Sequence, residues 1–93
     1  MKESRTKTDV KENPKATLKK IGSKLRKLRQ AAGYKNSDEF SYDHDINRSQ
    51  YGKYEAGAKD MRISSLLKTV NALGITLEEF FKQGLEEKSQ PKS

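Results

Sequence analysis

The chain has 93 residues, no cysteine and a formal charge of +7. This length suits one small domain, and the lack of cysteine excludes disulfides and cysteine-ligated zinc. No apolar run approaches the roughly 20 residues of a membrane span. Because no apolar stretch follows the basic N-terminus, we expect no secretory signal either. A cytoplasmic protein is the simplest interpretation.

The positive charge is concentrated in the first third of the chain. Residues 1–35 hold 12 Lys/Arg and 3 Asp/Glu, whereas residues 36–93 hold 8 and 10. Such an imbalance suggests an arm or helix that meets a polyanion. For residues 1–12 the alternative is a solvated tail that only keeps the protein soluble.

The first predicted helix starts at Asn13-Pro14, with Asn as the N-cap and Pro at the first helical position. Thr17 is a rival start. Apolar residues then recur at spacings of three and four, which indicates an amphipathic helix that ends at Gly33. These apolar residues are Leu18, Ile21, Leu25, Leu28 and Ala32. The outer face carries Lys19, Lys20, Lys24, Arg26 and Lys27.

A second, short helix is predicted from the run Asn36-Ser37-Asp38-Glu39. Asn36 fits as the N-cap, and Glu39 follows three residues later, as in a capping box. Phe40 is the expected buried residue of this helix. His44 and Asp45 lead into the turn that follows.

The third helix is predicted between Asn47 and Gly57. Asn47 can accept from the amide of Gln50, which sits at the third helical position as in a capping box, and Gly57 suits a left-handed C-cap. Tyr51 and Tyr54 share one face of this helix, which makes it the buried face. The opposite face, which can donate hydrogen bonds, carries Arg48, Ser49 and Lys53.

Two further helices complete the pattern after a polar loop at residues 58–62. The fourth shows a helical stripe that is closed by Gly74, and its members are Ile63, Leu66, Leu67, Val70 and Leu73. Thr76 and Glu79 have the spacing of a capping box that starts a short last helix. Its inward residues are expected to be Leu77, Phe80 and Phe81.

No strand pattern or hairpin dipeptide interrupts these helical segments. The predicted fold is therefore all-α, a compact bundle of five short helices. We expect residues 14–85 to form the folded domain, between a disordered basic arm at residues 1–13 and a disordered tail at residues 86–93.

Taken in this order, the motifs resemble the lambda-repressor/Cro-like (XRE) family of helix-turn-helix domains over residues 21–83. The resemblance rests on Ile21-Gly22, Leu25-Arg26, Leu28-Arg29, Gly33, Phe40, Tyr54-Glu55-Ala56-Gly57, Leu66-Leu67, Val70, Ala72-Leu73-Gly74-Ile75, Leu77 and Phe80. It implies a lambda-repressor-like bundle in which the second and third helices form the helix-turn-helix. The third would be the recognition helix that meets the base edges of DNA.

The resemblance assigns base-reading positions to Arg48, Ser49 and Lys53. Arg and Lys donate to guanine O6 and N7, and Ser can serve either type of base. Arg48 can alternatively hold a phosphate. Gln50 is the fourth base-reading candidate, with a competing role in the helix cap. Gly52 costs roughly 1 kcal/mol against Ala in a helix interior, which suggests close approach of a sugar-phosphate chain or of a packed helix.

Phosphate contacts are expected at the start of the second helix and after the third, from Lys35, Asn36, Ser37, Lys59 and Arg62. The first group lies where free amides and the helix dipole favour an anion. Arg29 and Glu55 resemble the family's structural ion pair, which would fix the pose of the recognition helix. Asp45 stands where the family usually has glycine, and aspartate tolerates the left-handed conformation of such a turn.

The sequence thus predicts a sequence-specific, double-stranded DNA-binding transcriptional regulator of the repressor type. A homodimer is expected, with Phe80, Phe81 and Leu85 at the dimer edge, because one such domain contacts few base pairs. A lone His44 predicts no metal site, and neither a cofactor, a small-molecule ligand nor an enzymatic activity is indicated. The alternative is a protein-interaction module, such as an antitoxin or an accessory subunit.

Overall fold

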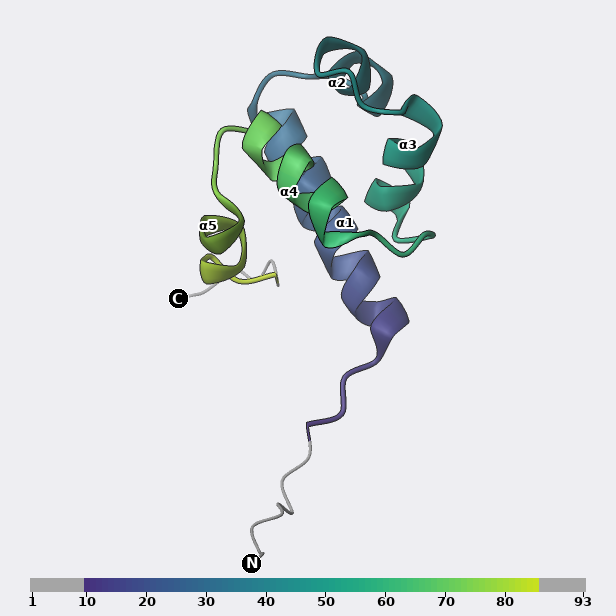
Figure 1. Cartoon of the computed structure of the whole chain (residues 1–93), viewed down its shortest axis with the longest axis vertical. Helices are drawn as coiled ribbons and strands as arrows, with labels where there is room; N and C mark the ends of the chain where they lie inside the picture. Colours follow the sequence, from purple (N-terminus) through teal and green to yellow (C-terminus); the bar gives the residue numbers. More distant parts are fainter. Residues whose placement is uncertain (1–9, 86–93) are drawn as a thin grey trace, which may run out of the picture.

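The computed structural model describes residues 10–85, and within them every regular element is a helix (Figure 1). The helices are α1 (Pro14–Ala31), α2 (Ser37–Asp43), α3 (Arg48–Ala56), α4 (Ile63–Ala72) and α5 (Leu77–Lys82). The prediction of an all-α bundle is confirmed. Most of the predicted arm and the whole of the predicted tail lie outside the described residues.

α1 and α4 lie at the middle of the bundle, with the other helices on either side of them. Figure 1 shows α2 and α3 on one side of these two helices and α5 on the other. α3 packs against both α1 and α2, whereas α5 packs against α4. A surface built on α3 is therefore separated from a surface built on α5.

Asparagine side chains define the starts of the first three helices. Asn13 accepts from the amides of Lys15 and Ala16 at 2.9 and 3.3 Å, so α1 starts at Pro14 and not at Thr17. Asn36 and Asn47 cap α2 and α3 at 2.8 and 2.9 Å.

The three predicted capping boxes differ, and that of α3 is limited to the bond from the amide of Gln50 to the Asn47 side chain. The box of α5 is complete, because Thr76 and Glu79 each accept from the other's amide, at 3.0 and 2.9 Å. That of α2 is not, because the Glu39 carboxylate accepts from the amide of Lys35 instead of Asn36. At the α2–α3 turn, Asp45 has the expected left-handed conformation, with φ of 55°.

The buried apolar core draws on all five helices. It consists of Ile21, Leu25, Phe40, Tyr51, Tyr54, Leu66, Val70 and Phe80. Phe40 and Tyr51 face each other at the centre, with ring centroids 5.0 Å apart. The core thus joins the helix-turn-helix pair to α1 and to the two C-terminal helices.

The predicted stripe of α4 is partly wrong. Ile63 and Leu67 are 65% and 43% exposed. They lie four residues apart on one helix face, and that face points to solvent. Thr69 is buried in their place, and its hydroxyl is satisfied by donating to the carbonyl of Ser65 at 2.9 Å.

The prediction for α5 needs a similar correction. Phe80 is fully buried, whereas its neighbour Phe81 is 44% exposed, because adjacent residues point about 100° apart around a helix. Phe80 is thereby removed from the predicted dimer edge. Ala32, expected inside, is exposed because it is the C-cap of α1.

Lys24, which the sequence placed on the solvated face of α1, connects this helix to α5. Its ammonium donates to the carbonyls of Phe80 and Gly84 and lies 4.8 Å from the centroid of the Phe80 ring. Partial burial lowers the pKa of Lys24. A six-residue helix needs such tertiary support. None of the described helices is long and apolar enough to cross a membrane.

Candidate nucleic-acid interface

α3 has one buried and one exposed face. Tyr51 and Tyr54 are buried in the core, whereas Arg48, Ser49 and Lys53 are exposed. Two large anchored rings on one side of a short helix fix its rotation about its own axis. The three polar side chains are consequently presented together on the outer face.

The C-terminal half of α3 lies directly against α1. A Cβ atom on Gly22 would lie only 2.4 Å from the carbonyl oxygens of both Tyr54 and Glu55. Only a glycine permits this approach of two backbones. Sequence reasoning used Gly22 only as part of the resemblance; its place beside Ile21, on the apolar face of α1, was the signal for a close helix contact.

Arg29 and Glu55 reinforce the same contact. The guanidinium of Arg29 donates to both carboxylate oxygens of Glu55, at 3.0 and 2.8 Å, and also to the carbonyl of Tyr34 at 3.1 Å. Both side chains are nearly buried, with exposures of 5% and 9%. The hydrogen bonds that Arg29 donates to Glu55 raise the pKa of Arg29. This bidentate pair holds the end of α3 on α1.

Among the described side chains, the Tyr51 hydroxyl is the buried polar group without a hydrogen bond of ordinary geometry, although it lies beside the Arg29–Glu55 pair. Burial raises the pKa of Tyr51, and the neighbouring Glu55 carboxylate raises it further. The phenol therefore stays neutral. Its role in α3 is that of a large apolar anchor.

The N-terminal half of α3 is open by comparison. Arg48 lies 3.7 Å from the carboxylate of Asp38 in the first turn of α2, and the two side chains are 70% and 64% exposed. An ion pair this long and this exposed contributes little to stability. Arg48 is therefore available to a partner that offers better hydrogen bonds.

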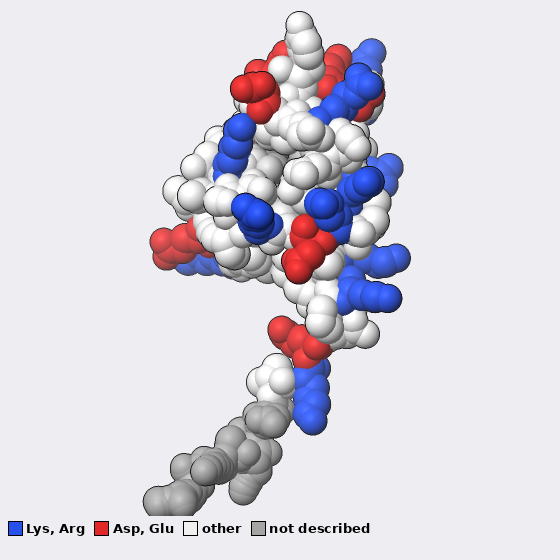
Figure 2. Space-filling model, turned by 45° about the vertical axis from the view of Figure 1, so that its right-hand side comes forward, with Lys and Arg blue, Asp and Glu red and all other residues white. Residues whose placement is uncertain are grey.

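The start of α2 is less receptive to an anion than its sequence suggested. The side-chain oxygen of Asn36 is already bonded to the amide of Glu39, and Glu39 itself occupies the amide of Lys35. Asp38 and Glu39 also add negative charge to the first turn. Figure 2 shows the result, with acidic and basic side chains side by side at the top of this face, where α2 lies.

Gly52 faces the start of α2. A Cβ atom there would meet only the Ser37 hydroxyl, at 4.0 Å. Because this is an ordinary van der Waals distance, the packing of α2 against α3 does not require a glycine. Of the two explanations that the sequence left open, close packing of a helix is thus excluded.

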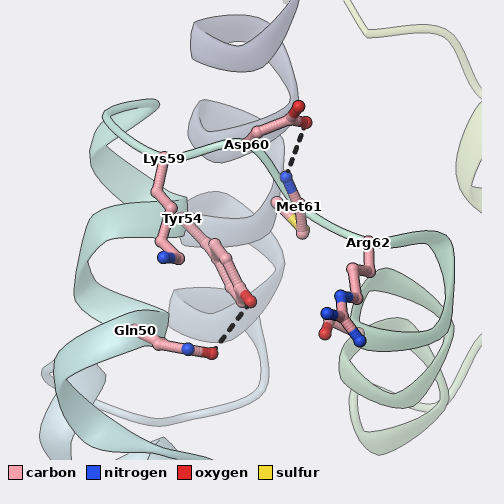
Figure 3. Close-up of a pocket in the computed structure, with 7 residues that line it drawn as sticks. Gln50, Tyr54, Lys59, Asp60, Met61 and Arg62 are labelled. Atoms are coloured by element: carbon pink, nitrogen blue, oxygen red, sulfur yellow. Dashed lines mark hydrogen bonds between the residues drawn. The ribbon is translucent and has the colours of Figure 1, made fainter.

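A hollow of about 610 Å³ lies between α3 and the segment that leads into α4 (Figure 3). It brings together Gln50 and Tyr54 from α3 with Lys59 and Arg62 from the loop. Both cations are exposed. The Tyr54 hydroxyl donates to the side-chain oxygen of Gln50 at 3.1 Å. Only the backbone amide of Gln50 takes part in the α3 cap, which leaves its side chain outside the cap.

His44 lies away from these groups. Its ring packs on Phe40, and its Nε2 is 3.1 Å from the hydroxyl of Tyr34. Across residues 10–85, no three His, Cys, Asp or Glu side chains are grouped so that they could hold a metal ion. The exposed polar side chains that make up the candidate interface belong to α2, α3 and the loop before α4.

A short helix with its back in the core, its end fastened to α1 and its polar front exposed beside α2 defines a helix-turn-helix DNA-binding domain. No family model matches the chain. The control protein C.MunI of a Mycoplasma species is 34% identical over 62 residues, which are 67% of this chain and 84% of that protein.

A solved structure agrees. The restriction-modification controller protein C.AhdI of Aeromonas hydrophila superposes with a TM-score of 0.64 at 33% identity, over 71% of this chain and 98% of that one. The chain belongs to the lambda-repressor/Cro-like (XRE) helix-turn-helix family of these control proteins. It is a DNA-binding transcriptional regulator.

Proposed function

We propose that the protein regulates the genes of a restriction-modification system by sequence-specific binding of double-stranded DNA, as a repressor. The proposal rests on α3, whose anchored back presents Arg48, Ser49 and Lys53 outward as one group. Inserted into a major groove, these side chains and Gln50 would meet the base edges. The likeness to C.AhdI, a restriction-modification controller protein, supports this class of regulated genes. Catalysis is no part of this proposal, and a cytoplasmic location is proposed with it, because the DNA is found there.

Phosphate contacts are proposed on both sides of α3. Lys59 and Arg62 line the hollow beside it and are exposed, so they suit the DNA strand that passes this edge. At the other edge, Lys35, Asn36 and Ser37 would contribute mainly through the ammonium, the hydroxyl and backbone amides, because the Asn36 oxygen is engaged in the cap. Such contacts position the domain without selecting a sequence.

A homodimer is proposed for binding two half-sites about 34 Å apart. α5 lies on the opposite side of α1 and α4 from α3 (Figure 1), so pairing through α5 leaves both recognition helices accessible. Phe81 is exposed there, and Leu85 is partly buried. Phe81→Glu should therefore convert dimers to monomers in analytical ultracentrifugation. An unchanged sedimentation coefficient would place the dimer surface elsewhere.

The central test is binding to DNA selected from a random library, followed over a salt series. Affinity should fall steeply with salt, since phosphate contacts release counterions. Arg48→Ala should relax discrimination between sequences, whereas Lys59→Ala should weaken all sequences alike and flatten the salt slope. Absence of any preferred sequence, or a flat salt response in the unmodified protein, would contradict the proposed function.

A further inference from the structure

We propose that the buried Tyr54 is a positioning residue for DNA recognition, which sets the side-chain amide of Gln50 for adenine in the major groove. The inference rests on the proposed function and deepens it. It starts from the bond between the Tyr54 hydroxyl and the Gln50 side-chain oxygen at 3.1 Å (Figure 3). This bond lies within α3, between residues one helical turn apart.

The position of the Tyr54 hydroxyl is determined by the core. The tyrosine is only 4% exposed, and its backbone carbonyl is held against Gly22 of α1. A tyrosine has few rotamers, and a buried one has fewer, so its hydroxyl oxygen occupies a fixed point at the rim of the hollow. The Tyr54 hydroxyl that donates to Gln50 is consequently held in place by the packing of the core.

Gln50 is exposed and lies between two hollows. It lines the larger one beside Lys59 and Arg62, and a smaller one of about 140 Å³ beside Ile46 and Lys68. Side-chain packing therefore restrains the amide of Gln50 little on either side. The hydrogen bond from Tyr54 is the contact that orders it before any DNA arrives, which lowers the entropy cost of binding.

The amide that this bond holds in place presents the pattern of one base. With the Tyr54 hydroxyl donating to the Gln50 oxygen, the amide oxygen keeps one lone pair and the amide nitrogen keeps both of its hydrogens. One acceptor and one donor side by side match the N6 amino group and N7 of adenine, the bidentate pairing of glutamine in the major groove. Had the amide been free to rotate, the same atoms would offer this pattern only part of the time.

The experiment compares base preference in sites selected from a random library for four proteins: the unmodified protein, Tyr54→Phe, Gln50→Glu and Tyr51→Phe. Tyr51→Phe is the matched control, because it removes a hydroxyl from the same buried face that lies beside the Arg29–Glu55 pair and not at Gln50. We expect the unmodified protein to prefer adenine at one position of each half-site. This preference should weaken with Tyr54→Phe and stay unchanged with Tyr51→Phe. Gln50→Glu should shift it to cytosine, because a carboxylate only accepts. Thermal unfolding of both tyrosine variants verifies that they are folded.

A second measurement tests the atoms directly. Replacing that adenine by 7-deazaadenine removes the N7 acceptor and should weaken the unmodified protein about fivefold or more, the lower end for a bidentate contact. Gln50→Ala should bind the two DNAs equally. If Tyr54→Phe prefers the same base as the unmodified protein at every position, this inference is wrong and the proposed function stands. The same holds if the unmodified protein binds the DNA without N7 as tightly as the normal DNA. No preferred sequence in the unmodified protein overturns the proposed function, and this inference with it.

Discussion

The two ends of α3 are held in opposite ways. At its C-terminal end, Gly22 of α1 lets the backbones of α1 and α3 come into contact, and Arg29 donates two hydrogen bonds to Glu55. At its N-terminal end, Arg48 and Asp38 form a loose and exposed pair at 3.7 Å. Both ends thus carry an arginine–carboxylate pair, but only the buried pair is expected to matter for stability, because burial decides how much is lost when one partner is removed.

This difference teaches how a nine-residue helix can present its side chains in one pose. Isolated helices of this length are marginal in water, so the pose comes from tertiary contacts at the C-terminal end, which is proposed to lie away from the DNA bases. The other end is left open for a partner. Substitutions at the closed end should act on stability, and those at the open end on binding.

The largest effect is expected at the buried ion pair. Glu55→Ala leaves the guanidinium of Arg29 buried beside Tyr34 without its carboxylate, and should lower the free energy of unfolding by about 3–5 kcal/mol. Urea denaturation followed by circular dichroism measures this. Asp38→Ala is the matched control in the open pair and should change stability by no more than about 1 kcal/mol. Equal losses in the two variants would contradict the division of α3 into two ends.

A slightly smaller loss is expected from Gly22→Ala. The new methyl group would have to occupy space 2.4 Å from two backbone carbonyls of α3, and backbone cannot yield as a side chain does. Overpacking of this kind costs about 3 kcal/mol, and the urea midpoint should fall accordingly. Ser23→Ala, at the exposed neighbouring position of α1, serves as the control. An unchanged midpoint for Gly22→Ala would show that α1 and α3 can separate freely.

Gly52→Ala should have the opposite sign. Its Cβ would meet only the Ser37 hydroxyl at 4.0 Å, so the gain in helix propensity of about 1 kcal/mol should appear as added stability. The two glycine substitutions thus separate a helix contact that needs glycine from one that does not. A loss of stability at Gly52 would mean that α2 and α3 pack more tightly than this distance implies.

Much of this arrangement was predictable from the sequence because local signals carry it. Asparagine caps at Asn36 and Asn47 located the starts of α2 and α3, and both were predicted correctly. For α1 the sequence offered two starts, and the structure selects the one capped by Asn13. The spacing of Tyr51 and Tyr54 likewise indicated that the face of α3 carrying both tyrosines would be buried. These features depend on a few neighbouring residues, so the chain order suffices to find them.

What escaped prediction depends on the approach of distant segments. The exposure of Ile63 and the burial of Thr69 follow from how α4 is rotated on the core, which periodicity alone leaves open. The bond from Tyr54 to Gln50 also escaped, since Gln50 had a plausible local role in the cap. Likewise, Lys24 resembled any solvated lysine until α5 was placed beside it.

The smallest change in stability is expected from Asp38→Asn at the open end of α3. The variant keeps the shape of the side chain and loses only an exposed pair with Arg48, so the free energy of unfolding should stay within about 0.5 kcal/mol. Its effect should appear in binding, because the carboxylate lies in the first turn of α2, where phosphates are proposed to approach, and it repels them.

Removing that charge should raise affinity for all DNA sequences about 3- to 10-fold at low salt, and the gain should shrink as screening increases. Fluorescence anisotropy with a preferred and a scrambled duplex over a salt series measures both. If only the preferred duplex gained, Asp38 would act by restraining Arg48 at a base, and not by repelling phosphates. If affinity fell for both, Asp38 would itself contact DNA as an acceptor, and the open end of α3 would extend onto α2.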